Sequence, residues 1–276
     1  MAQVQGVGKT ERLLWTTGIL LFLGIVGMFL LAPAWTQHPP VKPAAAMDSM
    51  SMPGMDMSSM PDMPGMTHDA APETPELQRK YAHDKRESEF NHHLAGVLVI
   101  LAGLFFLAQA PFVARWPAFR YAWPLCFLVG GFFLLLVSDT EIWPFGYMSF
   151  IYAVTHNPED AQHKTFALIL LVIGAFEMLR ASSRLRSVWS AWVFPVVGIV
   201  GSVLLLFHHH GGMHGPNAMA TMETVHHQHI GFAAVGFGAA LSKGLSETKF
   251  SWSSFLSKLW PVFLIFLGAM LVMYHE

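Results

Sequence analysis

Long apolar runs are the feature of this 276-residue sequence that most restricts its fold. An α-helix needs about 20 predominantly apolar residues to cross a bilayer, and most of the runs approach that length. They also explain why only 12% of the residues are charged, whereas a soluble domain carries about 25%. We therefore expect an all-α integral membrane protein. The seven runs lie at residues 13–32, 94–113, 121–137, 164–180, 190–207, 230–242 and 256–274.

The runs divide the chain into three parts. The first run predicts an N-terminal membrane anchor over residues 1–33. The A-x-A pattern at Ala32–Ala34 also fits cleavage of a signal peptide, but an apolar region of about 19 residues is long for one, so we favour the anchor. Residues 34–90 are Met-rich and lack an apolar face, which indicates a disordered linker. Residues 91–276 are expected to form a six-helix transmembrane domain of three tandem helical hairpins.

Lysine and arginine residues fall unevenly on the two sides of the predicted spans. Short cytoplasmic loops carry an excess of these residues in membrane proteins. The bias predicts a cytoplasmic N-terminus and places the Met-rich linker on the opposite, outer side of the membrane. The residues assigned to the cytoplasmic side are Lys9, Arg12, Arg115, Arg120, Arg180, Arg184, Arg186, Lys243, Lys249 and Lys258.

With this orientation, all fifteen histidines fall on the outer side. Longer outer loops collect polar residues in any case, but that alone would leave several histidines inside. We interpret the asymmetry as a sign of chemistry at the outer face. The histidines are His38, His68, His83, His92, His93, His156, His163, His208, His209, His210, His214, His226, His227, His229 and His275.

The three hairpins carry matching residues, which indicates an internal repeat. The first helix of each has a His followed eleven residues later by a Gly, and the second has a Pro followed after fourteen and fifteen residues by polar residues. Chance is the alternative explanation, as is the ordinary use of such residues near the ends of helices. The aligned sets are His92, His163 and His227; Gly103, Gly174 and Gly238; Pro124, Pro195 and Pro261; Ser138, His209 and His275; and Asp139, His210 and Glu276.

The segment MDSMSMPGMDMSSMPDMPGMTHD, residues 47–69, spaces eight methionines two or three residues apart. Thioether sulfur is a soft ligand that selects Cu(I), and it suits an oxidising compartment in which thiols form disulfides. A linker that is Met-rich by chance is the alternative. The expected copper ligands here are Met47, Met50, Met52, Met55, Met57, Met60, Met63, Met66 and His68.

A second candidate site lies in HHHGGMHGPNAMATMETVHHQH, residues 208–229. Imidazole binds copper, zinc, nickel and iron, so Cu(II) is possible here beside Cu(I). A polar loop with a histidine run is the alternative. The candidate ligands are His208, His209, His210, Met213, His214, His226, His227 and His229, joined at the outer rim by His92, His93, His163 and His275.

The histidines at predicted helix starts, and one acidic residue further along a predicted helix, have structural interpretations as well. A helix-terminal His often satisfies its own helix end, so a ligand role and a structural role are both open for His92, His93 and His163. Glu177 could belong to an ion or proton path. We favour pairing with Arg180, three residues later on the same helix.

The Met-rich segment resembles those of bacterial periplasmic copper-resistance proteins, and the outward His and Met residues resemble the copper-resistance D class of inner-membrane proteins. The resemblance implies a bacterial inner-membrane protein with its Met-rich linker in the periplasm, which handles copper at the periplasmic face for transport, sequestration or delivery. A periplasmic copper chaperone or a cuproenzyme is the partner that it implies.

Other function classes are less consistent with the sequence. It contains no Walker motif, no P-type phosphorylation motif and no CPC passage, so a P-type pump is excluded and no ATP-driven mechanism is visible. The net charge of −2 gives no sign of a nucleic-acid partner; membrane lipid is the expected surrounding. A redox protein holding haem b or copper and a metal-dependent membrane enzyme are the alternatives. We expect a non-enzymatic copper-binding protein.

Overall fold

The computed structural model describes residues 74–207 and 218–276. The expected anchor over residues 1–33 and the Met-rich linker up to residue 73 lie outside the described residues. So do His208, His209, His210, Met213 and His214. The described chain divides into two compact units, one holding residues 140–157 and the other holding the rest.

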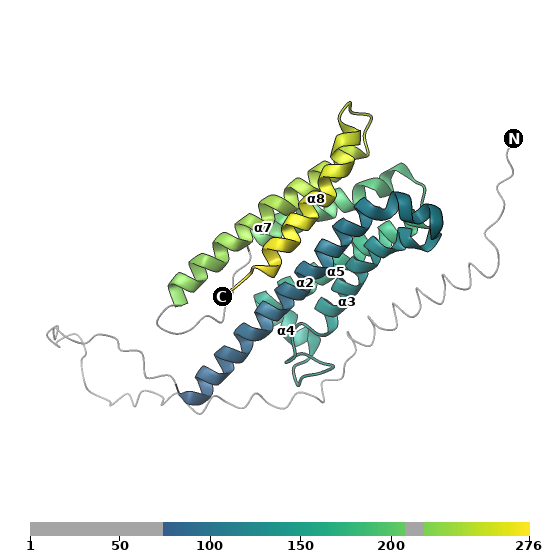
Figure 1. The fold of residues 1–276 in the computed structure, drawn as a ribbon. Coiled ribbons are helices and arrows are strands. Elements are labelled where there is room, and N and C mark those ends of the chain that lie inside the picture. The colour runs from purple at the N-terminus through teal and green to yellow at the C-terminus, as the bar shows by residue number, and fades with distance from the viewer. Residues whose placement is uncertain (1–73, 208–217) are drawn as a thin grey trace, which may run out of the picture. The chain divides into compact units, whose positions relative to one another are not determined.

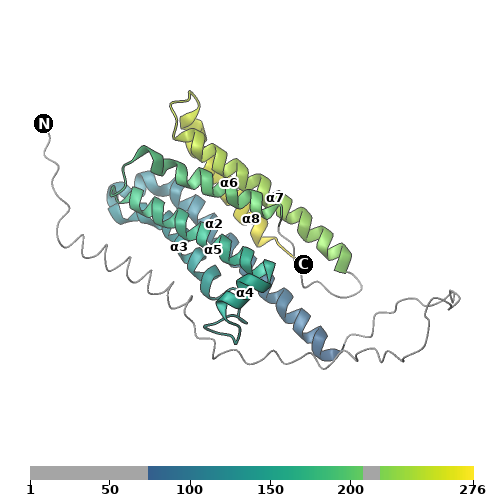
Figure 2. The same ribbon diagram turned by 180° about the vertical axis from the view of Figure 1, so that it is seen from behind.

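In the larger unit, the described residues form six α-helices that pack in a closed ring. The helices are α2 (Pro75–Arg115), α3 (Ala122–Leu136), α5 (Pro158–Ala181), α6 (Val193–Leu205), α7 (Ala218–Ser246) and α8 (Ser253–Val272), with 3-10 helices η3 (Pro117–Tyr121) and η4 (Val188–Trp192) before α3 and α6. Each helix contacts the next, and α8 returns to α2 (Figures 1 and 2). The expected all-α class is confirmed.

Helix α2 is longer at its start than the sequence interpretation allowed. It begins at Pro75, so residues 75–90, which we assigned to a disordered linker, are helical. The Thr74 side chain accepts a hydrogen bond from the Leu77 backbone N–H, Pro75 occupies the first turn, and Glu76 lies near the positive end of the helix dipole. These are standard helix-start features, and we overlooked them because the segment lacks an apolar stripe.

The centre of the ring is a cluster of aromatic side chains that supports the internal repeat. Trp123, Phe194 and Trp260 each precede one of the aligned prolines, and all three are buried. The Trp260 ring lies 5.6 Å from that of Trp123 and 5.5 Å from that of Phe194. Buried residues from all six helices join this cluster. Equivalent positions of the three hairpins therefore meet at one point.

Glycines allow the ring helices to approach closely and show that neighbours are antiparallel. A Cβ added at Gly103 would lie 2.6 Å from the Pro261 carbonyl oxygen, and one at Gly96 would lie 2.6 Å from that of Gly268. On the next interface, a Cβ at Gly174 would lie 2.8 Å from Leu128. Small residues let membrane helices pack backbone to backbone, so two of the aligned glycines have a packing role.

Four helical segments are long and apolar enough to cross a membrane, by length and composition: Pro75–Arg115, Pro117–Leu136, Val188–Leu205 and Ser253–Val272. Exposed tryptophans flank these segments at one end of the bundle, where lipid headgroups favour such rings. They are Trp116, Trp189, Trp192 and Trp252. A multi-pass membrane protein is the architecture that these features indicate.

The two ends of the ring differ in chemistry. The end that holds His92, His93, His163, His229 and His275 is called the histidine end. The opposite end holds Arg115, Arg120, Arg180, Arg184 and Lys243 and is called the basic end. Because neighbouring helices are antiparallel, each end gathers residues that are distant in sequence.

The smaller unit contains helix α4 (Phe150–His156). Ile142 and Met148 form an isolated parallel bridge, and the Met148 backbone N–H donates to the Glu141 carbonyl over 2.9 Å. The Ser149 side chain caps α4, and the His156 ring stacks on Tyr152 with 4.1 Å between ring centroids. His156 is thus held by its own helix.

Candidate functional site

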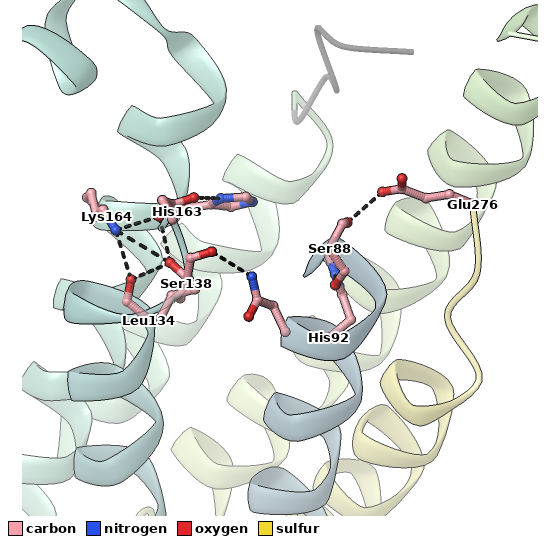
Figure 3. Close-up of polar contacts among 9 residues, drawn as sticks. Ser88, His92, Leu134, Ser138, His163, Lys164 and Glu276 are labelled. Atoms are coloured by element: carbon pink, nitrogen blue, oxygen red, sulfur yellow. Dashed lines mark hydrogen bonds and ion pairs between the residues drawn. The ribbon is translucent and has the colours of Figure 1, made fainter. Parts of the chain in front are cut away.

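A buried ion cluster joins the end of α3 to the start of α5 at the histidine end. The His163 Nδ1 donates to Asp139 Oδ1 over 3.2 Å, and the Lys164 ammonium contacts the other carboxylate oxygen. Lys164 also donates to the Leu134 carbonyl over 3.2 Å and contacts the Ser138 hydroxyl over 3.4 Å (Figure 3). The Lys164 side chain is only 5% exposed. A single carboxylate therefore balances two cationic groups away from water.

The protonation of this cluster follows from its contacts, and its acidic and imidazole groups lie outside the apolar runs. Burial favours neutral Asp139, but the hydrogen bond and charge of His163 and the charge of Lys164 prevail, so the Asp139 pKa is lowered. Burial opposes charge on His163, but the Asp139 hydrogen bond prevails and the His163 pKa is raised. Burial and the Asp139 charge raise the pKa of Asp160 to about 6. Such shifts follow from desolvation and neighbouring charge.

A second cluster joins α2, α7 and the residues after α8. The His92 ring stacks on Tyr274 with 3.8 Å between centroids, and the His229 ring lies 6.1 Å from each of them. The Ser88 hydroxyl donates to a Glu276 carboxylate oxygen (Figure 3), and the Tyr274 hydroxyl donates to the same oxygen over 2.7 Å. Two imidazoles from different helices thus lie within one aromatic cluster.

Further hydrogen bonds tie neighbouring helices together at this end. The Asn91 amide donates to the Ser138 carbonyl over 2.8 Å, and the Gln162 amide donates to the Phe207 carbonyl over 3.1 Å. The His93 Nε2 donates to the Tyr274 carbonyl over 3.0 Å. His93 therefore has a structural contact, whatever else it binds. These bonds hold α2 and α5 against the ends of α3, α6 and α8.

The aligned histidines His92, His163 and His227 have different surroundings among the described contacts. His92 lies with Tyr274 and His229, whereas His163 lies with Asp139 and Lys164. His227 is exposed and donates from Nδ1 to its own helix. His226 and His275 are also exposed. A metal site shared by the three aligned histidines stays a prediction.

Within residues 74–207 and 218–276, no group of three or more His, Cys, Asp or Glu side chains is arranged to hold a metal ion. The methionines of residues 47–66, His68 and the histidines of residues 208–214 lie outside those ranges. The potential ligands in the described part of the histidine end are therefore pairs of imidazoles and the groups of the ion clusters.

Sequence reasoning missed Lys164 and Tyr274 as members of these clusters. Lys164 directly follows the aligned His163, and Tyr274 directly precedes the aligned His275, but neither was among the candidate residues. The repeat alignment contained a signal for both, since it placed polar residues at Ser138, Asp139 and Glu276 and so marked where their partners would be.

The basic end contains the ion pair expected from the sequence. The Arg180 guanidinium donates to Glu177 over 3.1 Å and to Glu247 over 3.1 Å, and Lys243 pairs with Glu247. The Lys243 ammonium also lies 5.5 Å from the centre of the Trp260 ring. The pairing of Glu177 with Arg180 is confirmed.

Comparison of the chain with protein-family models, with curated proteins and with solved structures finds no match.

Proposed function

We propose that this protein binds Cu(I) at the outer face of a bacterial inner membrane. The methionines of residues 47–66 capture the ion, and the histidine end receives it for transport, sequestration or delivery to a periplasmic chaperone or cuproenzyme. The observation that carries the proposal is the gathering of histidines at one end of the bundle. His92, His163, His229 and His275 come from separate elements that antiparallel packing brings to the same end.

Helix α2 supports the proposal by linking the two sets of ligands. It runs from the end of the Met-rich linker directly to His92, with residues 75–80 exposed. The path from Thr74 to His92 is about 27 Å along the helix. Met63 precedes Thr74 by eleven residues, a length of chain that reaches up to about 36 Å. The chain that joins Met63, or any earlier methionine, to Thr74 is therefore long enough for that methionine to reach His92.

The orientation belongs to the same proposal. The six ring helices would all span the membrane, with α5 and α7 added to the four apolar segments because they complete the ring. The arginines of the basic end favour a cytoplasmic location, and the exposed tryptophans fit a headgroup layer at that end. The histidine end would then face the periplasm, as would the Met-rich linker.

Cu(I) and Ag(I) binding to the purified full chain tests the proposal. Competition with a chromophoric Cu(I) chelator should show several bound ions, and changing the eight methionines of residues 47–66 to leucine should remove most of them. A control variant carries leucine at Met178, Met270 and Met273, within or next to the bundle helices, and should bind as the parent does. Equal binding by the parent and the eight-leucine variant would show that the Met-rich segment does not capture copper.

A further inference from the structure

The imidazoles of His92 and His229 lie together at the junction of α2, α7 and the residues after α8. The role that we infer for them rests on the proposed function. His229 is 2% exposed and Tyr274 is 1% exposed, whereas His92 is half-buried. An ion that arrives from outside would therefore meet His92 before His229. Stacking on Tyr274 and packing of the His229 ring against Phe232, 5.6 Å away, hold both imidazoles in place.

Hydrogen bonds fix which ring nitrogen of each histidine carries the proton. The His92 Nδ1 donates to the Ser88 carbonyl over 2.8 Å, and the His229 Nδ1 donates to the Val225 carbonyl over 2.9 Å. In a neutral imidazole the other nitrogen, Nε2, then carries the lone pair that binds metals. Metal-binding histidines commonly donate their second N–H to a backbone carbonyl in this way. Both rings are thus set in the tautomer that a metal requires.

The spacing of the two rings suits a two-coordinate ion. Two imidazoles on opposite sides of one ion have ring centroids about 6 Å apart, because a metal–nitrogen bond is about 2 Å long and each nitrogen lies about 1 Å from its ring centre. The observed separation is 6.1 Å. The 67° angle between the ring planes is compatible, since rings can twist about a nitrogen–metal–nitrogen line. Cu(I) and Ag(I) accept such linear coordination, whereas Zn(II) prefers four ligands.

The ion cluster at the junction of α3 and α5 makes a weaker acceptor for the same ion. The His163 Nδ1 donates to a carboxylate that also binds the Lys164 ammonium. A cation placed at Asp139 would meet the charge of Lys164 at close range. His83 provides the control, because it is a histidine of the same helix as His92, its side chain is 70% exposed, and its ring lies near Asp84 and Glu87.

We propose that His92 and His229 form a two-imidazole acceptor site for Cu(I), filled from the Met-rich segment. The exchange moves one ion from neutral thioether ligands to neutral imidazole ligands, so no electron is transferred. The full chain with all eight methionines of residues 47–66 changed to leucine isolates this site. We expect it to keep about one Cu(I) or Ag(I), bound by nitrogen ligands in X-ray absorption spectra.

Two substitutions in the eight-leucine chain test the ligands and preserve their packing. His92→Phe keeps the stack on Tyr274 and removes the nitrogens, and His229→Asn keeps a donor for the Val225 carbonyl. Each should lower Cu(I) and Ag(I) affinity at least tenfold, whereas His83→Gln should change it less than twofold. Melting temperatures and elution from a sizing column establish that each variant is folded. If His229→Asn does not fold, His92→Phe alone tests the site.

Several results would overturn the site, and they separate it from the proposed function. If the eight-leucine chain binds no Cu(I) while the parent does, capture by the methionines stands and the imidazole acceptor is wrong. Unchanged affinity in folded His92→Phe has the same meaning, and it would leave the two rings as a packing cluster. Absence of Cu(I) and Ag(I) binding by the parent chain would refute both proposals.

Discussion

At the histidine end, Asp139 supplies the negative charge that pairs with His163 and Lys164 of α5. Its carboxylate accepts from His163 and pairs with Lys164, and its own side chain is 15% exposed. A buried pair is weak support for stability as a whole, but removal of one partner strands the other charge. The cost of losing this carboxylate should therefore exceed that of losing a surface acid.

Asp139→Asn should destabilise the protein by about 3 kcal/mol, because it removes the carboxylate that pairs with the buried Lys164 ammonium. Unfolding in detergent micelles, followed by tryptophan fluorescence, measures the change. Asp84→Asn is the control: its carboxylate is exposed and lies 3.8 Å from His83, so we expect about 0.5 kcal/mol or less. Similar losses in the two variants would contradict the importance of the buried cluster.

The pH dependence of stability should follow from His163 and Asp160. Both have a raised pKa in the folded state, so their contributions are complete at acidic pH and are lost as pH rises. The stability that Asp160 contributes should be lost between its ordinary pKa of about 4 and a pH of about 6. The stability that His163 contributes should be lost above about pH 6.5. Asp139, with its lowered pKa, supports the fold above its ordinary pKa of about 4 and loses effect only in stronger acid.

Melting temperatures between pH 4.5 and 8.5 measure this dependence. His163→Gln should flatten the decline above pH 6.5, and Asp160→Asn should flatten the part below about pH 6. Asp139, Glu159 and Lys164, the other charged groups that influence these two residues, are retained in both variants. A decline that is unchanged in both variants would show that other groups are responsible.

At the scale of helices, two adjacent glycines of α3 have opposite environments. A Cβ at Gly131 would lie 2.8 Å from Leu171 and 3.0 Å from the Ala167 carbonyl oxygen. A Cβ at Gly130 would meet Leu98 at 3.5 Å and Leu170 at 3.8 Å, which are ordinary contacts. Only Gly131 is required for the approach of α5.

Gly131→Ala should therefore destabilise the protein by about 1–3 kcal/mol through overpacking, whereas Gly130→Ala should stabilise it by up to about 1 kcal/mol through helix propensity. The two variants add the same methyl group one residue apart, so each is the control of the other. Unfolding in detergent micelles is again the measurement. Equal effects in both would mean that α3 and α5 do not approach as closely as described.

Helices were easier to predict than their contacts. Apolar runs such as 94–113 and 256–274 placed α2 and α8, because a membrane span needs a fixed length of apolar chain. The start of α2 at Pro75 was missed because its first turns are polar all round. The pairing of Lys164 with Asp139 depends on two helices meeting in space, so no local pattern contained it. The repeat alignment came closest, since its prolines marked the aromatic residues that meet at the centre.

For the whole molecule, orientation in the membrane is the property that its proposed function most requires. Cysteines introduced at Ser187 and Thr248 should be labelled only after the inner face is opened, because both lie at the basic end. A cysteine at Ser149 should be labelled from outside in intact cells, since its segment joins two helices at the histidine end. The reverse pattern would place the histidines in the cytoplasm and remove the basis for periplasmic copper capture.

The aromatic centre also determines what an ion can do once it is bound. A monovalent cation on the axis of the ring would have to leave water and all its ligands beside Trp123, Phe194 and Trp260, at an electrostatic cost of several kcal/mol or more. We therefore expect proteoliposomes that contain the protein to accumulate radioactive copper no faster than empty vesicles. Accumulation that requires the protein would mean that the ion permeates elsewhere, for instance along a seam between copies. Without such a route, copper bound as we propose would enter and leave by one face, and the membrane domain would insulate it from the opposite side.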